Sequence, residues 1–187
     1  IEVSIDWAKV PYRALVRIGY RGYGSGALMK DEQFNANLAG AKANNKLLGF
    51  YFFSQAITED EARAEADFCA SLAPTGYPLF FDSEWGHTTK TGVHDGRADN
   101  LTKAQRTACA RAFCVRAAAL GYQPGVYAST LWFRNRLDLS QLSQSPIWNA
   151  HYNVASSPIP CQMWQGTCTA RIPGYNGQID VNISYMG

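Results

Sequence analysis

Short apolar runs alternate with helical patterns along most of the chain, and this alternation most limits the folds open to it. Helical patterns cover residues 29–45, 58–73, 101–121 and 129–137, with Thr58 and Thr102 as N-caps and Gly121 as a stop. Strands that alternate with helices pair in parallel, so the pattern predicts a parallel sheet. Four runs rich in β-branched and aromatic residues predict its buried strands: residues 14–20, 46–54, 78–84 and 124–129.

The last part of the chain has strand patterns without helices. Residues 145–152, 160–166 and 177–185 predict three strands joined by Pro- and Gly-rich turns. Residues 1–4 predict an opening strand, and residues 5–10 predict a short helix capped by Asp6. Eight strands can close on themselves. We therefore predict one α/β domain over residues 1–187, a (β/α)-type barrel with a helix-poor last segment.

Composition excludes several classes of partner. A chain of 187 residues with 47% hydrophobic content can bury a core without metal or disulfide support. The net charge of +2, with scattered Lys and Arg, argues against nucleic acid as a partner. No apolar run reaches the length of a membrane span, so we expect no membrane insertion, and the first ten residues lead us to expect no export signal in this chain. No Cys/His spacing indicates a metal site, and we expect no cofactor.

The five cysteines fall into two groups. Cys69, Cys109 and Cys114 lie inside helical patterns, where a small buried thiol is the ordinary interpretation. Cys161 and Cys168 flank a turn-rich segment. We predict a short disulfide between these two if the compartment is oxidising, and two free thiols are the alternative.

Two carboxylates end one of the most apolar runs. In "PLFFDSEW", residues 78–85, Asp82 and Glu84 share one face of a strand, with Cα atoms roughly 6.6 Å apart. They lie at its carboxyl end, where barrels of this kind place their active sites. The alternation of "GQIDVNISY", residues 177–185, directs Asp180 into the barrel. In a closed barrel, Glu2 on the opening strand would lie next to Asp180.

Four carboxylates in one cavity are hard to explain by packing. Like charges raise one another's pKa and cost stability unless the site uses them. The structural alternative is a salt-bridge network in which Arg17, Arg21 or Lys46 pairs with the acids. Without metal ligands, paired acids most naturally catalyse acid/base chemistry on a glycosidic bond.

Aromatic side chains near the predicted strand ends are compatible with a carbohydrate cleft, because their faces can stack on sugar rings. Each one alone is better explained as part of the core than as a ligand contact. Trp164 is the most exposed by pattern, and a structural role is the simpler interpretation of His151. Gly22, Gly24 and Gly26 lack the spacing of a phosphate loop and predict a flexible loop. The aromatic candidates are Tyr51, Trp85, Tyr127, Trp132, Trp148, Tyr152 and Trp164.

These motifs resemble, in order and over essentially the whole chain, the family 25 glycoside hydrolases, lysozymes of the Chalaropsis type. The resemblance rests on "RIGYRGYGSGAL", "PLFFDSE", "GYQPGVYAS", "MWQ" and "QIDVNISY". It implies a flattened (β/α)5(β)3 TIM-like barrel. It also implies hydrolysis of the β-1,4 bond between N-acetylmuramic acid and N-acetylglucosamine in bacterial peptidoglycan, with retention.

The resemblance assigns roles to individual positions. Glu84 would be the general acid and then the base, Asp82 would orient the 2-acetamido group or stabilise positive charge, and Asp180 would complete the acidic floor. Glu2 stands where the family has aspartate, and the loop that usually follows is missing, which leaves its role open. The substrate-binding candidates are Tyr51, Tyr127, Tyr152, Trp164 and Gln165.

Other functions remain to be compared with this one. A catalytically weak or inactive peptidoglycan-binding relative is the main alternative. A chitinase of the DxxDxDxE kind is disfavoured, because Tyr77 and Phe80 occupy its two upstream aspartate positions. We expect a monomer that acts on bacterial cell-wall peptidoglycan, extracellular or associated with the wall, and either secreted or phage-derived.

Overall fold

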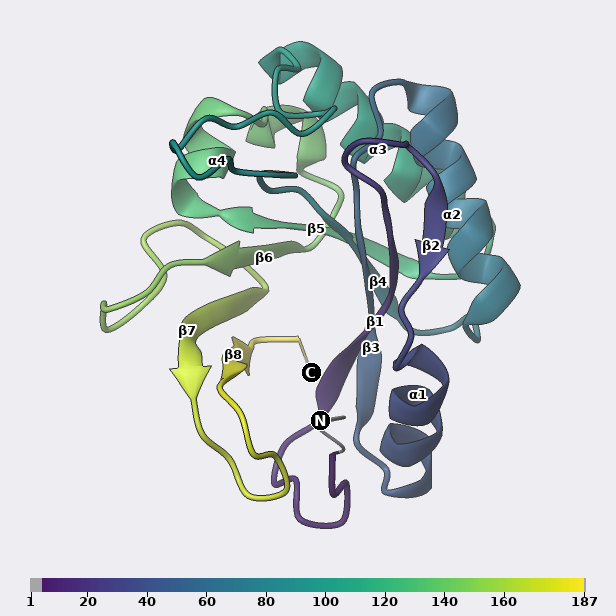
Figure 1. Ribbon diagram of the computed structural model, residues 1–187, viewed down its shortest axis with the longest axis vertical. Coiled ribbons are helices and arrows are strands. Elements are labelled where there is room, and N and C mark those ends of the chain that lie inside the picture. Colours follow the sequence, from purple (N-terminus) through teal and green to yellow (C-terminus); the bar gives the residue numbers. More distant parts are fainter. Residues whose placement is uncertain (1–4, 187) are drawn as a thin grey trace.

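The fold is built on one curled sheet of eight strands. The computed structural model describes residues 5–186 (Figure 1). The strand order is β2-β1-β3-β4-β5-β6-β7-β8, with β1 and β3 to β7 parallel and the edge strands β2 and β8 antiparallel to their neighbours. Over the described residues the sheet is a half-barrel in a single-domain α/β fold. The strands are β1 (Ala14–Arg21), β2 (Leu28–Lys30), β3 (Leu47–Phe53), β4 (Pro78–Asp82), β5 (Gln123–Ser129), β6 (Ile147–Ala150), β7 (Met163–Ala170) and β8 (Ile179–Ser184).

The helices cover one side of this sheet, and α2 packs along α3 (Figure 1). As predicted, Thr58 caps α2 by accepting the Glu61 N–H, and Thr102 caps α3 in a capping box with Gln105. Gly121 follows α3 at φ +91°, a conformation that favours glycine. Among residues 5–186, no helix has the length and apolar character needed to cross a membrane. The helices are α1 (Phe34–Ala43), α2 (Glu59–Leu72), α3 (Lys103–Ala119), α4 (Thr130–Asn135) and the 3-10 helix η1 (Leu139–Leu142).

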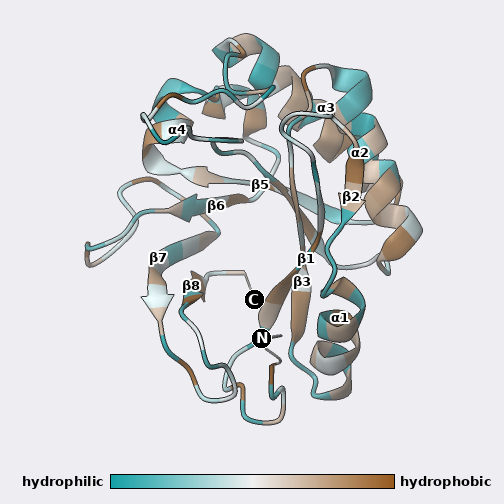
Figure 2. Ribbon diagram, viewed as in Figure 1, coloured by the Kyte–Doolittle hydropathy of each residue, from teal (hydrophilic) through white to brown (hydrophobic). Residues whose placement is uncertain are grey.

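Strand alternation divides the core into two clusters. On β4, Leu79 and Phe81 face the helices, whereas Phe80 faces the concave side of the sheet beside Trp148 and Met163. Because neighbouring residues of a strand point to opposite faces, a nearly continuous apolar run fills both sides. Figure 2 shows the resulting hydrophobic ribbon along β1 and β3. Asp82 falls on the same side as Phe80, so β4 carries its carboxylate to the concave face.

Three details differ from the predicted elements. Residues 5–10 form a turn stabilised by the Asp6–Lys9 ion pair at 2.8 Å, and not a helix. Residues 28–30 form β2, antiparallel to β1, where the pattern predicts the start of a helix. The predicted opening strand, residues 1–4, lies outside the described residues.

The predicted Cys161–Cys168 disulfide is wrong, because both thiols are free. Cys168 lies in β7, five residues beyond Met163. At about 3.3 Å per residue this segment spans roughly 16 Å, well over the approximately 4.4–6.8 Å between the Cα atoms of a disulfide. The prediction that Cys69, Cys109 and Cys114 are buried is confirmed.

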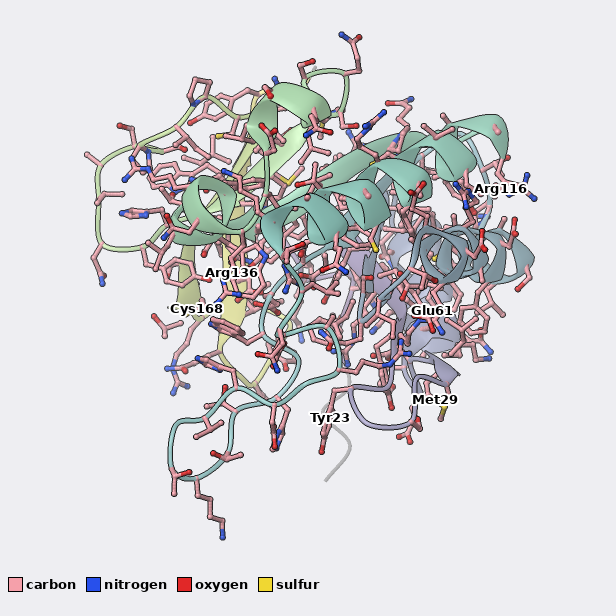
Figure 3. All side chains as sticks on the ribbon, turned by 90° about the horizontal axis from the view of Figure 1, so that it is seen from above. Tyr23, Met29, Glu61, Arg116, Arg136 and Cys168 are labelled. Carbon is pink, nitrogen blue, oxygen red and sulfur yellow. The ribbon has the colours of Figure 1, made fainter. Side chains whose placement is uncertain are left out.

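Thiol labelling should reproduce this pattern. In native, unreduced protein we expect Cys168, which is exposed (Figure 3), to react first with an aromatic disulfide reagent, and the half-buried Cys161 to react more slowly. The three buried thiols should react only after unfolding. Fewer than five thiols in unfolded, unreduced protein would contradict the structure.

Candidate active site

A polar pocket of about 230 Å³ lies at the carboxyl ends of the central strands. It brings together three acids from distant parts of the sequence. Asp82 is the last residue of β4, Glu84 follows it by two positions, and Asp180 lies on the edge strand β8. The pocket is lined by Arg17, Tyr51, Phe53, Asp82, Glu84, Tyr127, Trp148, Gln165 and Asp180.

The three acids differ in exposure. Asp82 is only 4% exposed, whereas Glu84 and Asp180 are open to solvent. Among the described residues none of the three forms an ion pair, since Arg17 pairs with Asp31 and Arg21 pairs with Glu65. The structural alternative, a salt-bridge network around these acids, is therefore wrong. The pocket places one buried carboxyl beneath two accessible ones.

The environment raises the pKa of all three acids. Burial and then the charges of Glu84 and Asp180 raise the pKa of Asp82, with Arg17 opposing. Although the side chains of Glu84 and Asp180 reach solvent, the surrounding protein atoms exclude part of their water. This partial loss of hydration, followed by the Asp180 charge, raises the pKa of Glu84, and partial loss of hydration raises that of Asp180. Raised carboxyl pKa values keep a proton in the pocket at a pH where surface acids have lost theirs. Such a pocket can supply a general acid.

One oxygen of Asp82 has no hydrogen-bond partner. Its Oδ1 atom is buried and accepts no hydrogen bond from any described residue. A buried acceptor without a donor costs free energy, and such atoms concentrate where a ligand supplies the missing partner. Asp82 is therefore suited to accept a hydrogen bond from a bound molecule.

Aromatic side chains form the floor of the pocket. Trp148 contacts Tyr51, Phe80 and Tyr127 edge-on or tilted, with ring centroids 5.9, 5.3 and 4.5 Å away. Its indole N–H donates to Asn182 on β8 at 2.8 Å. These rings fill the interior of the half-barrel below Asp82, so the carboxylates lie above closely packed apolar side chains.

Gln165 on β7 joins two tyrosines at the rim. Its side-chain oxygen accepts the hydroxyl of Tyr127 at 2.8 Å and that of Tyr152 at 2.6 Å. Burial raises the pKa of Tyr152 to about 12 and raises those of Tyr51 and Tyr127 further. The three tyrosines are therefore neutral at physiological pH and can act as hydrogen-bond partners.

The structure brings most, but not all, of the predicted substrate-binding residues to the acidic pocket. Tyr51, Tyr127 and Gln165 line the pocket, and Tyr152 reaches it through Gln165. The prediction that Trp164 contacts the substrate is wrong. Trp164 is only 6% exposed, and its indole N–H donates to the backbone oxygen of His151. It faces the side of β7 away from the pocket and belongs to the core. Glu2 lies outside the described residues.

Two lining residues were missing from the predicted site although the sequence holds a signal for them. Arg17 interrupts the apolar run of β1, where alternation places it opposite the buried Val16 and Ile18. Trp148 appeared only as one of several aromatic candidates, and β6 turns it toward the acids. Phe53, at the end of β3, has no signal that separates it from its apolar neighbours.

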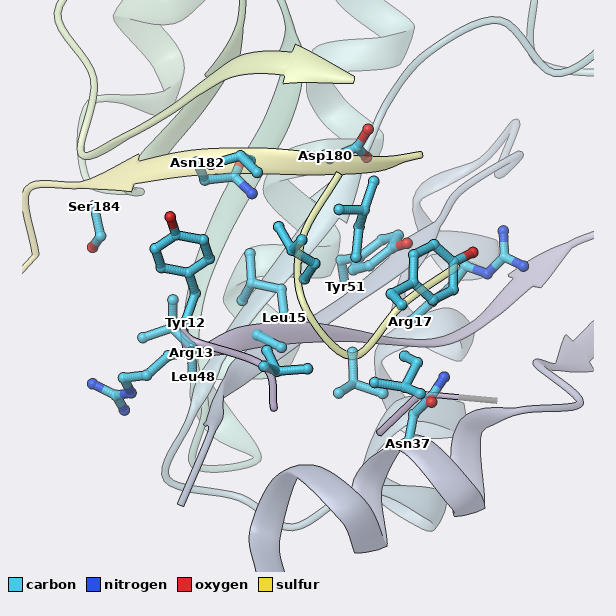
Figure 4. Close-up of a pocket in the computed structure, with 18 of the residues that line it drawn as sticks. Tyr12, Arg13, Leu15, Arg17, Asn37, Leu48, Tyr51, Asp180, Asn182 and Ser184 are labelled. Atoms are coloured by element: carbon cyan, nitrogen blue, oxygen red, sulfur yellow. The ribbon is translucent and has the colours of Figure 1, made fainter. Parts of the chain in front are cut away.

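A larger hollow adjoins the acidic pocket. It measures about 710 Å³, lies between β1 and β8, and shares Arg17, Tyr51, Trp148 and Asp180 with the pocket. Figure 4 shows β8, which carries Asp180 and Asn182, running across this hollow from β1. It marks the open seam of the half-barrel over the described residues.

Comparison with known proteins identifies the fold and the family. The profile of the Glycosyl hydrolases family 25 matches residues 2–175. The chain belongs to this family. Three acids in one pocket, at the carboxyl ends of the strands, therefore lie in a family 25 glycosyl hydrolase fold.

Among its relatives, this family 25 chain is 26% identical over 196 residues to Lysozyme M1 of Streptomyces globisporus, covering 96% of the chain and 63% of that protein. The chain thus spans under two thirds of that relative. The bacterial lysozyme from Streptomyces coelicolor matches at a TM-score of 0.74 with 22% identity, over 97% of this chain and 86% of that one. The modular autolysin LytC from Streptococcus pneumoniae, solved with a synthetic peptidoglycan ligand, matches at 0.78 with 20% identity, over 95% and 42%.

Proposed function

We propose that this chain is a peptidoglycan hydrolase that cleaves the β-1,4 bond between N-acetylmuramic acid and N-acetylglucosamine. The observation that carries the proposal is the shared pocket of Asp82, Glu84 and Asp180, three acids without ion-pair partners among residues 5–186. Family membership and the relatives named as lysozymes and autolysins point to the same substrate.

The geometry suggests a different catalytic role for each of the three acids. Glu84 is accessible and has a raised pKa, so it protonates the leaving glycosidic oxygen and then activates water as a base. The free Oδ1 atom of Asp82 accepts the N–H of the 2-acetamido group and orients it at the anomeric carbon. Asp180 adds negative charge that stabilises the developing oxocarbenium ion. The oxygen of the 2-acetamido group bonds to the anomeric carbon as the protonated leaving group departs, and the water that Glu84 deprotonates then displaces that oxygen. These two displacements together give retention of configuration.

Digestion of purified peptidoglycan tests the proposal. We expect new reducing ends on N-acetylmuramic acid, identified by borohydride reduction and mass spectrometry of the fragments. Reducing ends on N-acetylglucosamine would contradict the proposed bond. Binding to peptidoglycan without any new reducing end would instead favour an inactive relative, and faster release from chitin would favour a chitinase.

The closure of the barrel and the extent of the domain follow from the same proposal. The hollow of about 710 Å³ between β1 and β8 leaves the described half-barrel open at that seam, and we propose that the whole chain forms a flattened (β/α)5(β)3 barrel. We further propose that residues 1–187 form a single catalytic domain; Glu2 lies outside the described residues. The protein would act as a monomer on the bacterial cell wall, outside the cell that makes it or at the end of a phage infection.

Replacement of Asp180 by Asn should shift the pH profile. Burial and then the Asp180 charge raise the pKa of Glu84, so removal of the charge lowers that pKa. Because the general acid must be protonated, the alkaline limb of kcat/KM should move to lower pH. The pH profile of reducing-end release measures this, and an unmoved limb would contradict the coupling. Asp138→Asn, at the half-buried N-cap of η1 and outside the pocket, is the matched control.

A further inference from the structure

The loop that follows Glu84 is fastened at its base by one buried carboxylate. Asp99 is 1% exposed. Its Oδ1 atom accepts the backbone N–H of Gly86 at 2.7 Å, and its Oδ2 atom accepts that of Gly96 at 2.7 Å and that of His87 at 3.4 Å. Both oxygens are thus used to hold the two ends of residues 86–96 together. Hydrogen bonds to an ionised acceptor are roughly twice as strong as neutral ones.

The two ends of the loop touch at this point. A Cβ atom on Gly96 would lie 2.7 Å from the Asp99 Oδ2 atom and 2.9 Å from the Cα atom of Gly86. Only glycine allows this approach of the two backbones. The Asp99 N–H also donates to the Gly96 carbonyl at 2.9 Å. The base of the loop is therefore a closed ring of backbone and one side chain.

Asp99 is itself attached to the rest of the fold. Its neighbour Ala98 donates its N–H to Gln55, a fully buried residue just after β3, at 3.2 Å. The Arg136 guanidinium donates to the Asp99 carbonyl at 3.3 Å and also lies 4.6 Å from the centre of the Trp85 ring. The clamp thus ties the start of the loop to β3 and to the end of α4.

Glu84 lies between two anchored neighbours while its own side chain makes no hydrogen bond with the described residues. On one side, Ser83 donates its N–H to the Tyr127 carbonyl and accepts the indole N–H of Trp132. On the other side, the Trp85 ring stacks on His94 at 3.7 Å, within the loop. The direction of the Glu84 carboxyl therefore depends on how firmly residues 85 and 86 are held.

We propose that Asp99 is a positioning residue for Glu84: its carboxylate fixes the loop base and so holds the acid over the pocket that contains Asp82 and Asp180. The proposal rests on the hydrolase function proposed above. Asp99 does not touch the reacting atoms and acts through Gly86 and Trp85. Figure 3 shows the flank of this loop, with Tyr23 from the β1–β2 connection beside it, where its ring stacks on His87 at 4.6 Å.

Asp99→Asn tests the proposal with almost no change of shape. The amide offers one acceptor oxygen in place of two and turns an N–H group toward a backbone N–H, so one end of the loop is released. We expect kcat to fall by about 10- to 100-fold, the loss that a misplacement near 1 Å produces, with KM within about threefold. We also expect the alkaline limb of the pH profile to move to lower pH, because a displaced Glu84 moves away from the surrounding protein atoms and from Asp180, which together raise its pKa.

Asp95→Asn is the matched control. Asp95 is exposed in the same loop and pairs with His87 instead of closing the base. It should keep the wild-type rate and pH profile within about twofold. A folded Asp99→Asn variant that behaves like this control would overturn the proposal, and so would a loss confined to KM with an unmoved pH profile. If Asp99→Asn does not fold, Gly96→Ala, whose Cβ displaces the same carboxylate, is judged by the same criteria.

A second measurement separates this proposal from the proposed function. In the wild-type protein, the amide protons of Gly86 and Gly96 should exchange with solvent more slowly than those of Lys90 and Thr91 at the loop tip. Equal exchange rates would overturn the clamp. Slow exchange in a protein that releases no reducing ends would leave the clamp in place and overturn the hydrolase function, and with it the catalytic role of the clamp.

Discussion

Glu84→Gln is expected to reduce the rate of reducing-end release by roughly 10²–10⁴-fold, the range over which general acid–base groups contribute to catalysis. Glutamine keeps the shape of the side chain but has no proton to give to the glycosidic oxygen. Binding of peptidoglycan should change little, because the pocket walls stay in place. Release of reducing ends from purified peptidoglycan, together with a co-sedimentation assay for binding, measures both quantities.

Glu32→Gln, an exposed change outside the pocket, is the control and should retain full activity. A Glu84→Gln variant that keeps the wild-type rate and pH profile would remove Glu84 from the acid role. Loss of the Glu84 carboxyl should also lower the pKa of Asp82, because the Glu84 charge is, after burial, the largest cause that raises it. Carbon-13 titration of the aspartate carboxyls can follow this shift.

Arg21→Ala should cost the largest loss of stability among single changes away from the pocket. Arg21 is 6% exposed, and its Nε atom donates to the fully buried Glu65 at 2.7 Å. Its other nitrogens donate to the carbonyl groups of Gly26 and Glu61 at 2.7 and 2.9 Å. Removal of one partner leaves a buried charge uncompensated, which costs about 3–5 kcal/mol of the free energy of unfolding. Urea unfolding measures the difference.

The pH dependence of this loss can be derived from Glu65. Burial raises its pKa from 4.5 to about 7, although bonds from Ser54 and Arg21 lower it. The folded state therefore holds the proton more tightly than the unfolded state, and stability falls as the pH rises from about 4.5 to about 7. Without Arg21 this fall should be steeper, so the variant loses more at pH 8 than at pH 5. Arg63→Ala, which breaks exposed pairs with Glu59 and Asp60, should cost about 0.5 kcal/mol or less at either pH.

Much of the sheet follows from local pattern. The buried strands β3, β4 and β5 are nearly continuous apolar runs, and Thr58 and Thr102 begin their helices as the capping rules predict. The short strand β2 could not be predicted, because three residues become a strand only by pairing with β1. Residues 5–10 fail as a helix because Pro11 follows one turn later, which leaves too few residues to form backbone hydrogen bonds.

The site could be predicted where it depends on period-two alternation. Alternation along residues 78–84 and 177–185 predicts that Asp82, Glu84 and Asp180 point into the barrel, and the pocket contains all three. Trp164 could not be judged in this way, since its partner, the His151 carbonyl, comes from another segment. The same limit applies to Asp99, whose bonds to Gly86 and Gly96 join residues that no periodic pattern relates.

The contacts of Asp99 with Gly86 and Gly96 close the base of the loop after β4, and the tip of the loop lies beyond them, away from the carboxylates of the pocket. Between His87 and Asp95 the chain makes an excursion whose outermost residues, Thr88 and Lys90 to Val93, are exposed. Extra residues inserted at Lys90 would extend the tip while Asp99 kept its grip on both glycines. The protein thus offers a grafting point close to Glu84 in sequence but beyond both the Asp99 contacts and the Trp85–His94 stack, at which an affinity tag or a fluorescent reporter can be carried.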